Sequence, residues 1–310
     1  MPHIVNHEYS SAQKKVYSKA KILVLISLLY SSSICIILFL VMGHSQTMWT
    51  NFVESIFNIF PPIIFLASNY TCTKPHNKRY PYGYHKIITL AFFATAFTLF
   101  VFGIYLFQSA IMVLINQEHP TIGLMSVAGR DIWQGWIMMS VMVFTIPISM
   151  TLSRLKEKLA YPLNDKVLFN NAKMNKADWM TNLASVAGVF GVGYGIWWLD
   201  AVAAALVSLD ILFDGSSQLR NSMNELMDCS PKSLDGQFLD LPEQIKKVLV
   251  GHKKIQRAEV CLREVGHVFC GEGFITLKDA DHISIDELKA LNKEIKKLDW
   301  RLNNFFVILT

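Results

Sequence analysis

Two carboxylates stand inside long apolar segments of this sequence, where an ionisable residue is costly and marks a functional site by default. Glu54 lies in the apolar segment 48–70, and Asp178 lies in the segment 175–198. Asn58 follows Glu54 by four positions, so the two side chains share one face of a helix. Carboxylate and amide oxygens bind hard and borderline cations. The pattern therefore predicts a cation site between membrane helices.

Each of these polar residues also has a structural interpretation. Glu54 could pair with a buried lysine or amide, although no Lys or Arg is expected at a similar depth in any apolar segment. Asp178 stands near the start of its segment, where the helix dipole stabilises an acid. Asp210 and Asp214 lie one turn apart in the segment 201–219. They either line the mouth of a pathway or have a structural role.

The elements that must position these residues follow from hydropathy. Of the 310 residues, 52% are hydrophobic and only 17% are charged, whereas roughly 25% are charged in an average soluble protein. A helix that crosses a bilayer needs roughly 20 apolar residues. Six segments meet this need wholly or in part, at residues 21–43, 48–70, 87–115, 132–152, 175–198 and 201–219. A membrane bundle of six helices is therefore expected over residues 21–228.

Basic residues give this bundle an orientation. Lys and Arg gather in the N-terminal tail 1–20 and in the connections 71–86 and 154–176, and they are almost absent from the alternate connections. An excess of Lys and Arg marks cytoplasmic loops. Both termini are therefore expected in the cytoplasm.

Residues 229–310 have the balance of charged and apolar residues of a small globular domain. Amphipathic helices are predicted at 241–253 and 284–298, and Ser284 with Glu287 forms a capping box at the start of the second. Strands are predicted at 258–264, 271–277 and 305–309. This α-β-β-α-β order is enough for a small cytoplasmic two-layer α+β domain.

Cysteine and histidine offer a weaker metal candidate in this domain. The five cysteines form no CxxC pair, so neither a zinc ribbon nor a redox motif is indicated. Cys261 and Cys270 flank a predicted hairpin and could hold a metal together with His267. The alternative is that Cys261 belongs to the strand core and His267 to a turn. The sequence contains no HExxH motif or nucleophile–base set, so no enzyme activity is expected. The net charge of +5 does not argue for binding to nucleic acid.

Several motifs, taken in order, resemble the cation diffusion facilitator family, the proton-coupled zinc and manganese exporters. YPYGYHK at 80–86 is similar to the family's HPFGHGK stretch between helices two and three. NKAD at 175–178, followed by TNLASVAG, resembles the start of helix five. WWLDAVAAA at 197–205 and LMD at 226–228 resemble the turn into helix six and its end. The chain is identified as a divergent member of this family.

The resemblance implies an integral membrane homodimer, in which six transmembrane helices precede a ferredoxin-like C-terminal domain. It implies an antiporter that exports a divalent cation by alternating access, with protons as counter-ion and no permanently bound cofactor. The transport site by family position is Glu54, Asn58, Met174 and Asp178, with Asn175 and Asp210 as further candidates. Tyr80 and Tyr84 stand where some members carry the histidines of a peripheral metal site.

Two alternatives stay open at this site. Oxygen ligands with one thioether do not decide between Zn, Mn, Fe, Co and Cd. Asn58 and Met174 replace residues that are usually Asp or His in the family. The chain is therefore either a transporter with an altered site or a non-transporting member that acts as a metal sensor, partner subunit or structural membrane protein. Convergence of Glu54, Asn58 and Asp178 in one cavity would favour transport.

Overall fold

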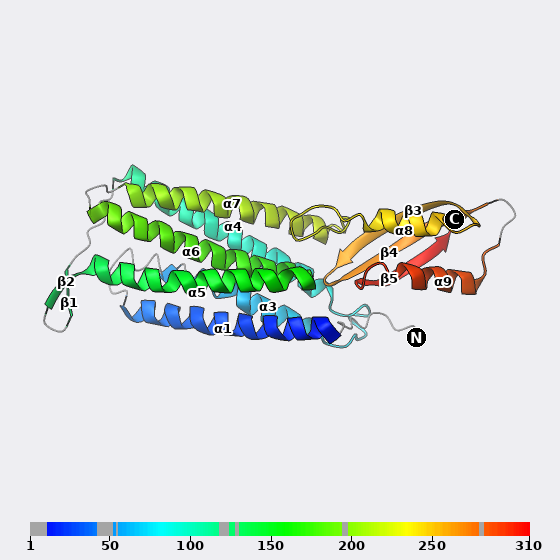
Figure 1. Ribbon diagram of the computed structural model, residues 1–310, viewed down its shortest axis with the longest axis horizontal. Coiled ribbons are helices and arrows are strands. Elements are labelled where there is room, and N and C mark those ends of the chain that lie inside the picture. The colour runs from blue at the N-terminus through cyan, green and yellow to red at the C-terminus, as the bar shows by residue number, and fades with distance from the viewer. Residues whose placement is uncertain are drawn as a thin grey trace. The chain divides into compact units, whose positions relative to one another are not determined.

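Two compact units make up the chain, shown in Figure 1. The computed structural model describes residues 11–41, 52–53, 55–117, 124–127, 130–193, 198–278 and 282–310. The helical unit comprises Lys15–Leu66 and Phe93–Arg220. The mixed unit comprises Met1–Lys14, Ala67–Phe92 and Asn221–Thr310.

Long helices dominate the sequence up to residue 226. They are α1 (Ser11–Val41), α3 (Phe60–Cys72), α4 (Lys86–Ile115), α5 (Gln134–Leu163), α6 (Lys166–Gly193) and α7 (Leu199–Leu226). Residues 52–53 and 55–57 are helical as well. Between α4 and α5 lies an antiparallel pair of short strands, β1 (Leu124–Val127) and β2 (Arg130–Trp133).

Several helices extend beyond the apolar segments that hydropathy marks. α1 begins at Ser11 rather than residue 21, and α7 ends at Leu226 rather than residue 219. The basic connection expected at 154–176 is helical except for a short turn. Hydropathy marks only the part of a helix that must be apolar, whereas a helix continues for as long as its charged residues find water or partners.

The turn between α5 and α6 is built from two residues. Asn164 adopts a positive φ of 48°, a conformation that asparagine tolerates better than most residues. The Asp165 carboxylate accepts a hydrogen bond from the backbone N–H of Leu168 at 2.8 Å and so caps the first turn of α6. α5 and α6 therefore form a tight helical hairpin, and residues assigned to a loop by composition lie on its two arms.

The described helices have the surface of a membrane protein. Three of the described helical stretches are long and apolar enough to cross a bilayer, namely Gln13–Ile37, Lys86–Ile115 and Ala201–Leu226. Large apolar side chains point outward, with Leu29 62% exposed and Phe213 72% exposed. An apolar exterior around buried polar groups suits lipid rather than water. The count of six spans stays a prediction.

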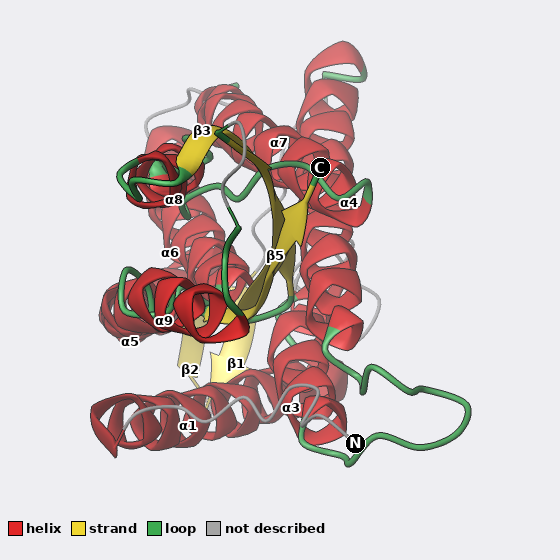
Figure 2. Ribbon diagram, turned by 90° about the vertical axis from the view of Figure 1, so that its right-hand side faces the viewer, coloured by secondary structure: helices red, strands yellow, loops and turns green. Residues whose placement is uncertain are grey.

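A three-stranded sheet with two helices forms the C-terminal part of the mixed unit. The elements are α8 (Leu241–Val250), β3 (Ile255–Val265), β4 (Val268–Leu277), α9 (Ile285–Ile295) and β5 (Leu302–Leu309). β3 and β4 pair antiparallel, and β5 pairs with β4 in parallel. α8 and α9 lie on the same side of the sheet, as Figure 2 shows. Between helices and sheet lies an apolar core that includes Ile245, Leu249, Ile275, Ile295 and Phe305.

The capping box predicted at the start of α9 is confirmed, and it includes a lysine from outside the helix. The Ser284 hydroxyl accepts a hydrogen bond from the backbone N–H of Glu287, and the Ser284 N–H donates to the Glu287 carboxylate. The Lys254 ammonium lies 2.9 Å from Glu287 Oε1. The hydrogen bonds from Lys254 and from Ser284 lower the pKa of Glu287 from its usual 4.5 to about 2.

This lowered pKa predicts a pH-dependent effect of the variant Glu287→Gln. Because the pKa is lower in the folded state, the stabilisation is present above about pH 4.5 and is lost as the pH falls toward about 2. We expect Glu287→Gln to lower the Tm of the purified protein at pH 6 and to have no effect near pH 2. Glu294→Gln, on the exposed side of α9, is the control. Equal Tm values for Glu287→Gln and wild type at pH 6 would contradict the prediction.

Candidate functional site

Asp178 on α6 is the centre of a polar cluster inside the helical unit. The Asn58 side chain, in the turn before α3, donates from Nδ2 to Asp178 Oδ1 at 2.9 Å. The hydroxyl of Ser149 on α5 donates a short hydrogen bond to Asp178 Oδ2. Ser149 is fully buried. Side chains from two other parts of the helical unit thus converge on the carboxylate of α6.

The amide oxygen of Asn58 is available for a ligand. Its Oδ1 atom is buried and has no hydrogen-bond partner among the described residues. A buried acceptor left without a donor costs roughly 1–3 kcal/mol. A cation coordinated by Asn58 Oδ1 and a carboxylate oxygen of Asp178 would remove this cost and would find the oxygen ligands that hard cations prefer.

The other residues of the expected transport site have different surroundings. Glu54 lies outside the described residues. Met174 is 2% exposed and belongs to an apolar cluster with Leu99, Phe102 and Ile211. The structure therefore gives Met174 a packing environment and does not include it among the hydrogen bonds around Asp178.

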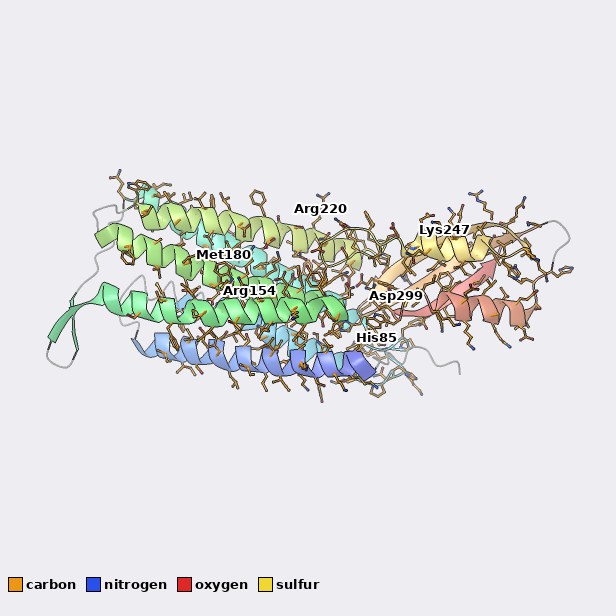
Figure 3. All side chains as sticks on the ribbon, viewed as in Figure 1. His85, Arg154, Met180, Arg220, Lys247 and Asp299 are labelled. Atoms are coloured by element: carbon orange, nitrogen blue, oxygen red, sulfur yellow. The ribbon has the colours of Figure 1, made fainter. Side chains whose placement is uncertain are left out.

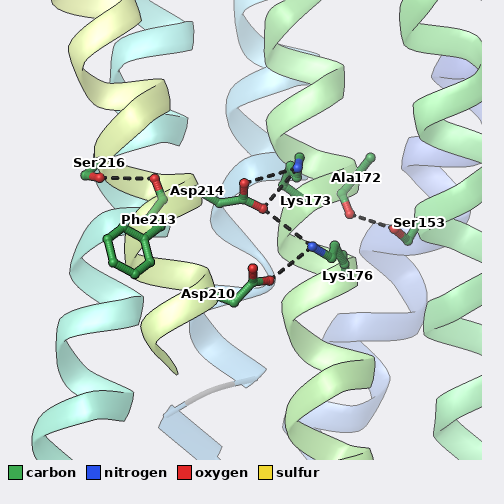
Figure 4. A network of polar contacts seen from close by, with 8 residues as sticks. All are labelled: Ser153, Ala172, Lys173, Lys176, Asp210, Phe213, Asp214 and Ser216. Atoms are coloured by element: carbon green, nitrogen blue, oxygen red, sulfur yellow. Dashed lines mark hydrogen bonds and ion pairs between the residues drawn. The ribbon is translucent and has the colours of Figure 1, made fainter. Parts of the chain in front are cut away.

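Asp210 and Asp214 are engaged in ion pairs between α7 and α6, shown in Figure 4. Lys173 Nζ lies 3.0 Å from Asp214 Oδ2. Lys176 Nζ lies 3.1 Å from Asp210 Oδ2 and 3.7 Å from Asp214 Oδ2. These contacts favour the structural interpretation of both acids, because each carboxylate already neutralises a lysine of the neighbouring helix.

The candidate ligands Cys261, His267 and Cys270 do not gather into a cluster of metal ligands in the described part of the chain. Cys261 on β3 pairs with Glu272, and Cys270 on β4 pairs with Arg263, so the two cysteines are diagonal neighbours. Both thiols are free, and His267 lies in the turn between the strands. Among the described residues, no group of three or more His, Cys, Asp or Glu side chains could hold a metal ion.

The loop between α3 and α4 is held by aromatic and amide contacts. Asn77 Nδ2 donates to the Tyr84 hydroxyl at 2.8 Å, and the Tyr80 N–H donates to Asn77 Oδ1 at 2.8 Å. The Tyr80 and Tyr84 rings lie 4.7 Å apart between centroids. These two tyrosines, which replace the histidines of a peripheral metal site, therefore support the loop directly.

Composition alone assigns Lys156 of α5 to the cytoplasmic side of the membrane, whereas the structure places its side chain in the interior of the helical unit. Its side chain is 0% exposed, whereas Arg154, two residues earlier and labelled in Figure 3, is exposed. Lys156 Nζ donates to Ser27 Oγ on α1 at 2.6 Å and to Asn171 Oδ1 on α6 at 2.6 Å. Lys156 lies beyond the apolar segment 132–152, in the connection 154–176 that was expected to be a basic cytoplasmic loop, and the structure buries it among α1, α5 and α6.

Asn175 belongs to the surroundings of this lysine. Lys156 Nζ donates to Asn175 Oδ1 at 2.5 Å, so the candidate ligand Asn175 is already occupied. A sequence signal for this contact exists, because Asn171, Asn175 and Asp178 are four and three positions apart and share one face of a helix. Such a polar stripe indicates a polar partner on the neighbouring helix.

Similarity to known proteins extends over the helices that carry this cluster. The family profile described as the cation efflux transmembrane domain matches residues 22–227. The chain belongs to the cation efflux, or cation diffusion facilitator, family. The protein is accordingly a membrane protein, as its exposed apolar helices also indicate.

The cation efflux protein has curated relatives at modest identity. Mitochondrial metal transporter 1 of Saccharomyces cerevisiae is 26% identical over 223 residues, which cover 66% of this chain and 43% of that protein. Manganese efflux system protein MneS of Bacillus subtilis is 22% identical over 60% of each chain. The putative transporter MamV of Paramagnetospirillum magneticum is 26% identical over 83% of this chain and 71% of that protein. The matched region spans less than half the length of the yeast relatives.

Proposed function

We propose that this cation efflux protein carries a divalent metal cation across a membrane and that Asp178 and Asn58 bind the cation on its way. The observation that carries the proposal is the convergence of Asn58 and Ser149 on the Asp178 carboxylate, with the Asn58 Oδ1 atom left without a partner among the described residues. Ionisable groups inside a membrane bundle mark ion pathways. The names of the relatives, a mitochondrial metal transporter and a manganese efflux protein, support a metal as cargo.

The chemistry of these ligands favours Mn²⁺ or Fe²⁺ over Zn²⁺. Carboxylate, amide and hydroxyl oxygens suit harder cations, whereas zinc sites are built mainly from His and Cys. No histidine or cysteine hydrogen-bonds to Asp178, whose described side-chain partners are Asn58 and Ser149. Glu54 is proposed as a further oxygen ligand on the strength of its family position.

The proposed transport cycle needs no covalent chemistry, and no enzyme activity is proposed. A carboxylate can hold a metal or a proton in turn, so Asp178 suits exchange of the cation for protons. Alternating access of the helices would expose the site to the two sides of the membrane in turn. A homodimer with both termini in the cytoplasm, and with a ferredoxin-like C-terminal domain, is part of the same proposal.

Uptake by reconstituted protein tests the proposal. We expect purified protein in liposomes to take up Mn²⁺ along an imposed pH gradient with saturating kinetics, and we expect Asn58→Ala to raise the KM. Uptake of Fe²⁺, Co²⁺, Zn²⁺ and Cd²⁺ under the same conditions ranks the metals. If folded protein moves none of these five ions, the proposal fails.

A non-transporting family member is the second candidate. Two observations favour it: the buried Lys156 donates to the candidate ligand Asn175, and Met174 lies in an apolar environment. Both leave fewer of the expected residues to bind a metal. This candidate predicts that metal binding to the protein in detergent is measurable while uptake into liposomes is absent.

A further inference from the structure

Lys156 on α5 and Asp178 on α6, a base and an acid, lie along the contact between these two helices, the α5–α6 seam of the helical unit. We propose that Lys156 is the built-in counter-ion of Asp178 and determines how tightly the transported metal is held. The proposal rests on the proposed function and adds to it a specificity-determining residue that does not touch the metal.

The surroundings of Lys156 fix its ammonium group. A lysine ammonium has three N–H donors. Three oxygens accept them: Ser27 Oγ at 2.6 Å, Asn171 Oδ1 at 2.6 Å and Asn175 Oδ1 at 2.5 Å. The side chain is 0% exposed. Every donor of the ammonium is therefore satisfied by neutral oxygens, and the charge has a defined position.

The same seam joins Lys156 to Asp178. On α5, Ser149, Ser153 and Lys156 are four and three positions apart and share one face. Ser149 donates to Asp178, and Ser153 donates to the backbone oxygen of Ala172 at 2.9 Å. Lys156 meets Asn175, whose Cα lies one helical turn, about 5 Å along α6, from that of Asp178.

The seam carries one ionisable group of each sign. Among the described residues Lys156 forms no direct ion pair, and Asp178 lies on the same face of α6 as Asn175, which Lys156 contacts. The Asp178 carboxylate likewise has no basic hydrogen-bond donor among its described contacts. A buried charge without compensation is costly, so each group supplies the charge that stabilises the other.

This arrangement has a consequence for a divalent cation bound at Asp178. Without metal, Lys156 balances the carboxylate. With metal, the ammonium repels the cargo through a medium of low dielectric constant and favours its release. Lys156 therefore lowers the affinity of the site and raises the rate at which the metal leaves.

Kinetic variants of the reconstituted protein separate this role from a structural one. Lys156→Met keeps the length of the side chain and removes the charge, and we expect it to lower the KM for Mn²⁺ at least about tenfold while lowering kcat. Lys156→Arg keeps the charge on a larger side chain, and in folded protein its KM should lie closer to the wild-type value than that of Lys156→Met. Lys158→Met, at an exposed position of the same helix, should leave both constants unchanged. An unchanged KM for Lys156→Met, beside an active wild type, overturns the proposal.

A double-mutant cycle tests the same pairing without transport. We expect the Tm loss caused by Asp178→Asn in detergent to be at most about half as large in the Lys156→Met background as in wild type, because the counter-charge is already absent. Additive losses overturn the counter-ion role even if the protein transports. Coupled losses in a protein that moves no metal support the charge pair and count against the proposed function.

Discussion

We expect Asp178→Ala to lower the initial rate of Mn²⁺ uptake by the reconstituted protein at least about a hundredfold, which corresponds to roughly 3 kcal/mol. The physical reason is that Asp178 supplies a full negative charge where the hydration shell of the metal must be replaced, and neutral oxygens do not compensate for that charge. The Asn58 amide and the Ser149 hydroxyl would remain, but both lose their shared acceptor. We expect Asp178→Glu to retain a measurable part of the rate.

Asp210→Asn is the matched control for this loss of charge. Asp210 is an acid of α7 whose carboxylate pairs with Lys176 and is half exposed. Its replacement should leave uptake within about threefold of wild type, since exposed ion pairs contribute little. Wild-type uptake by Asp178→Ala, or an equal loss for both variants, would remove the reason for placing the transport site at Asp178.

We expect Gly215→Leu to destabilise the helical unit by at least about 3 kcal/mol. A Cβ atom on Gly215 of α7 would lie 2.8 Å from the Cα and 2.9 Å from the backbone nitrogen of Phe100 on α4. A Cβ atom on Gly103, one turn further along α4, would lie 3.0 Å from Cγ of Leu212 on α7. Two small residues thus let these helix backbones touch, as is common in membrane bundles. The yield of folded protein and its Tm in detergent measure the effect.

Ser216→Leu introduces the same side chain at the next position of α7. Ser216 is exposed, and among the described residues its hydroxyl hydrogen-bonds to the backbone oxygen of Phe213 on its own helix, so this variant should fold with a Tm close to that of wild type. Gly215→Ala should show part of the loss, because its single methyl group already meets the Phe100 backbone. A stable Gly215→Leu protein would mean that α4 and α7 are further apart than described.

The elements of the C-terminal domain and the apolar parts of the membrane helices could be predicted from the sequence, because both depend on local patterns. α4 was expected at 87–115 and runs from Lys86 to Ile115. The capping box of Ser284 and Glu287 follows from residues three positions apart. The ends of α5 and α6 could not be predicted in this way, because their charged residues find partners on other helices and the helices continue.

The sequence by itself determined which residues could bind a cation, since Asp178 and Asn58 are polar residues in apolar segments. Only the tertiary structure decided which of the candidates meet. Asn58 and Asp178 are 120 positions apart and are hydrogen-bonded, whereas Asn175 and Asp210 are occupied by Lys156 and Lys176. The physical reason is that periodicity places a residue on a face of its own helix, while the packing of helices distant in sequence decides what that face contacts.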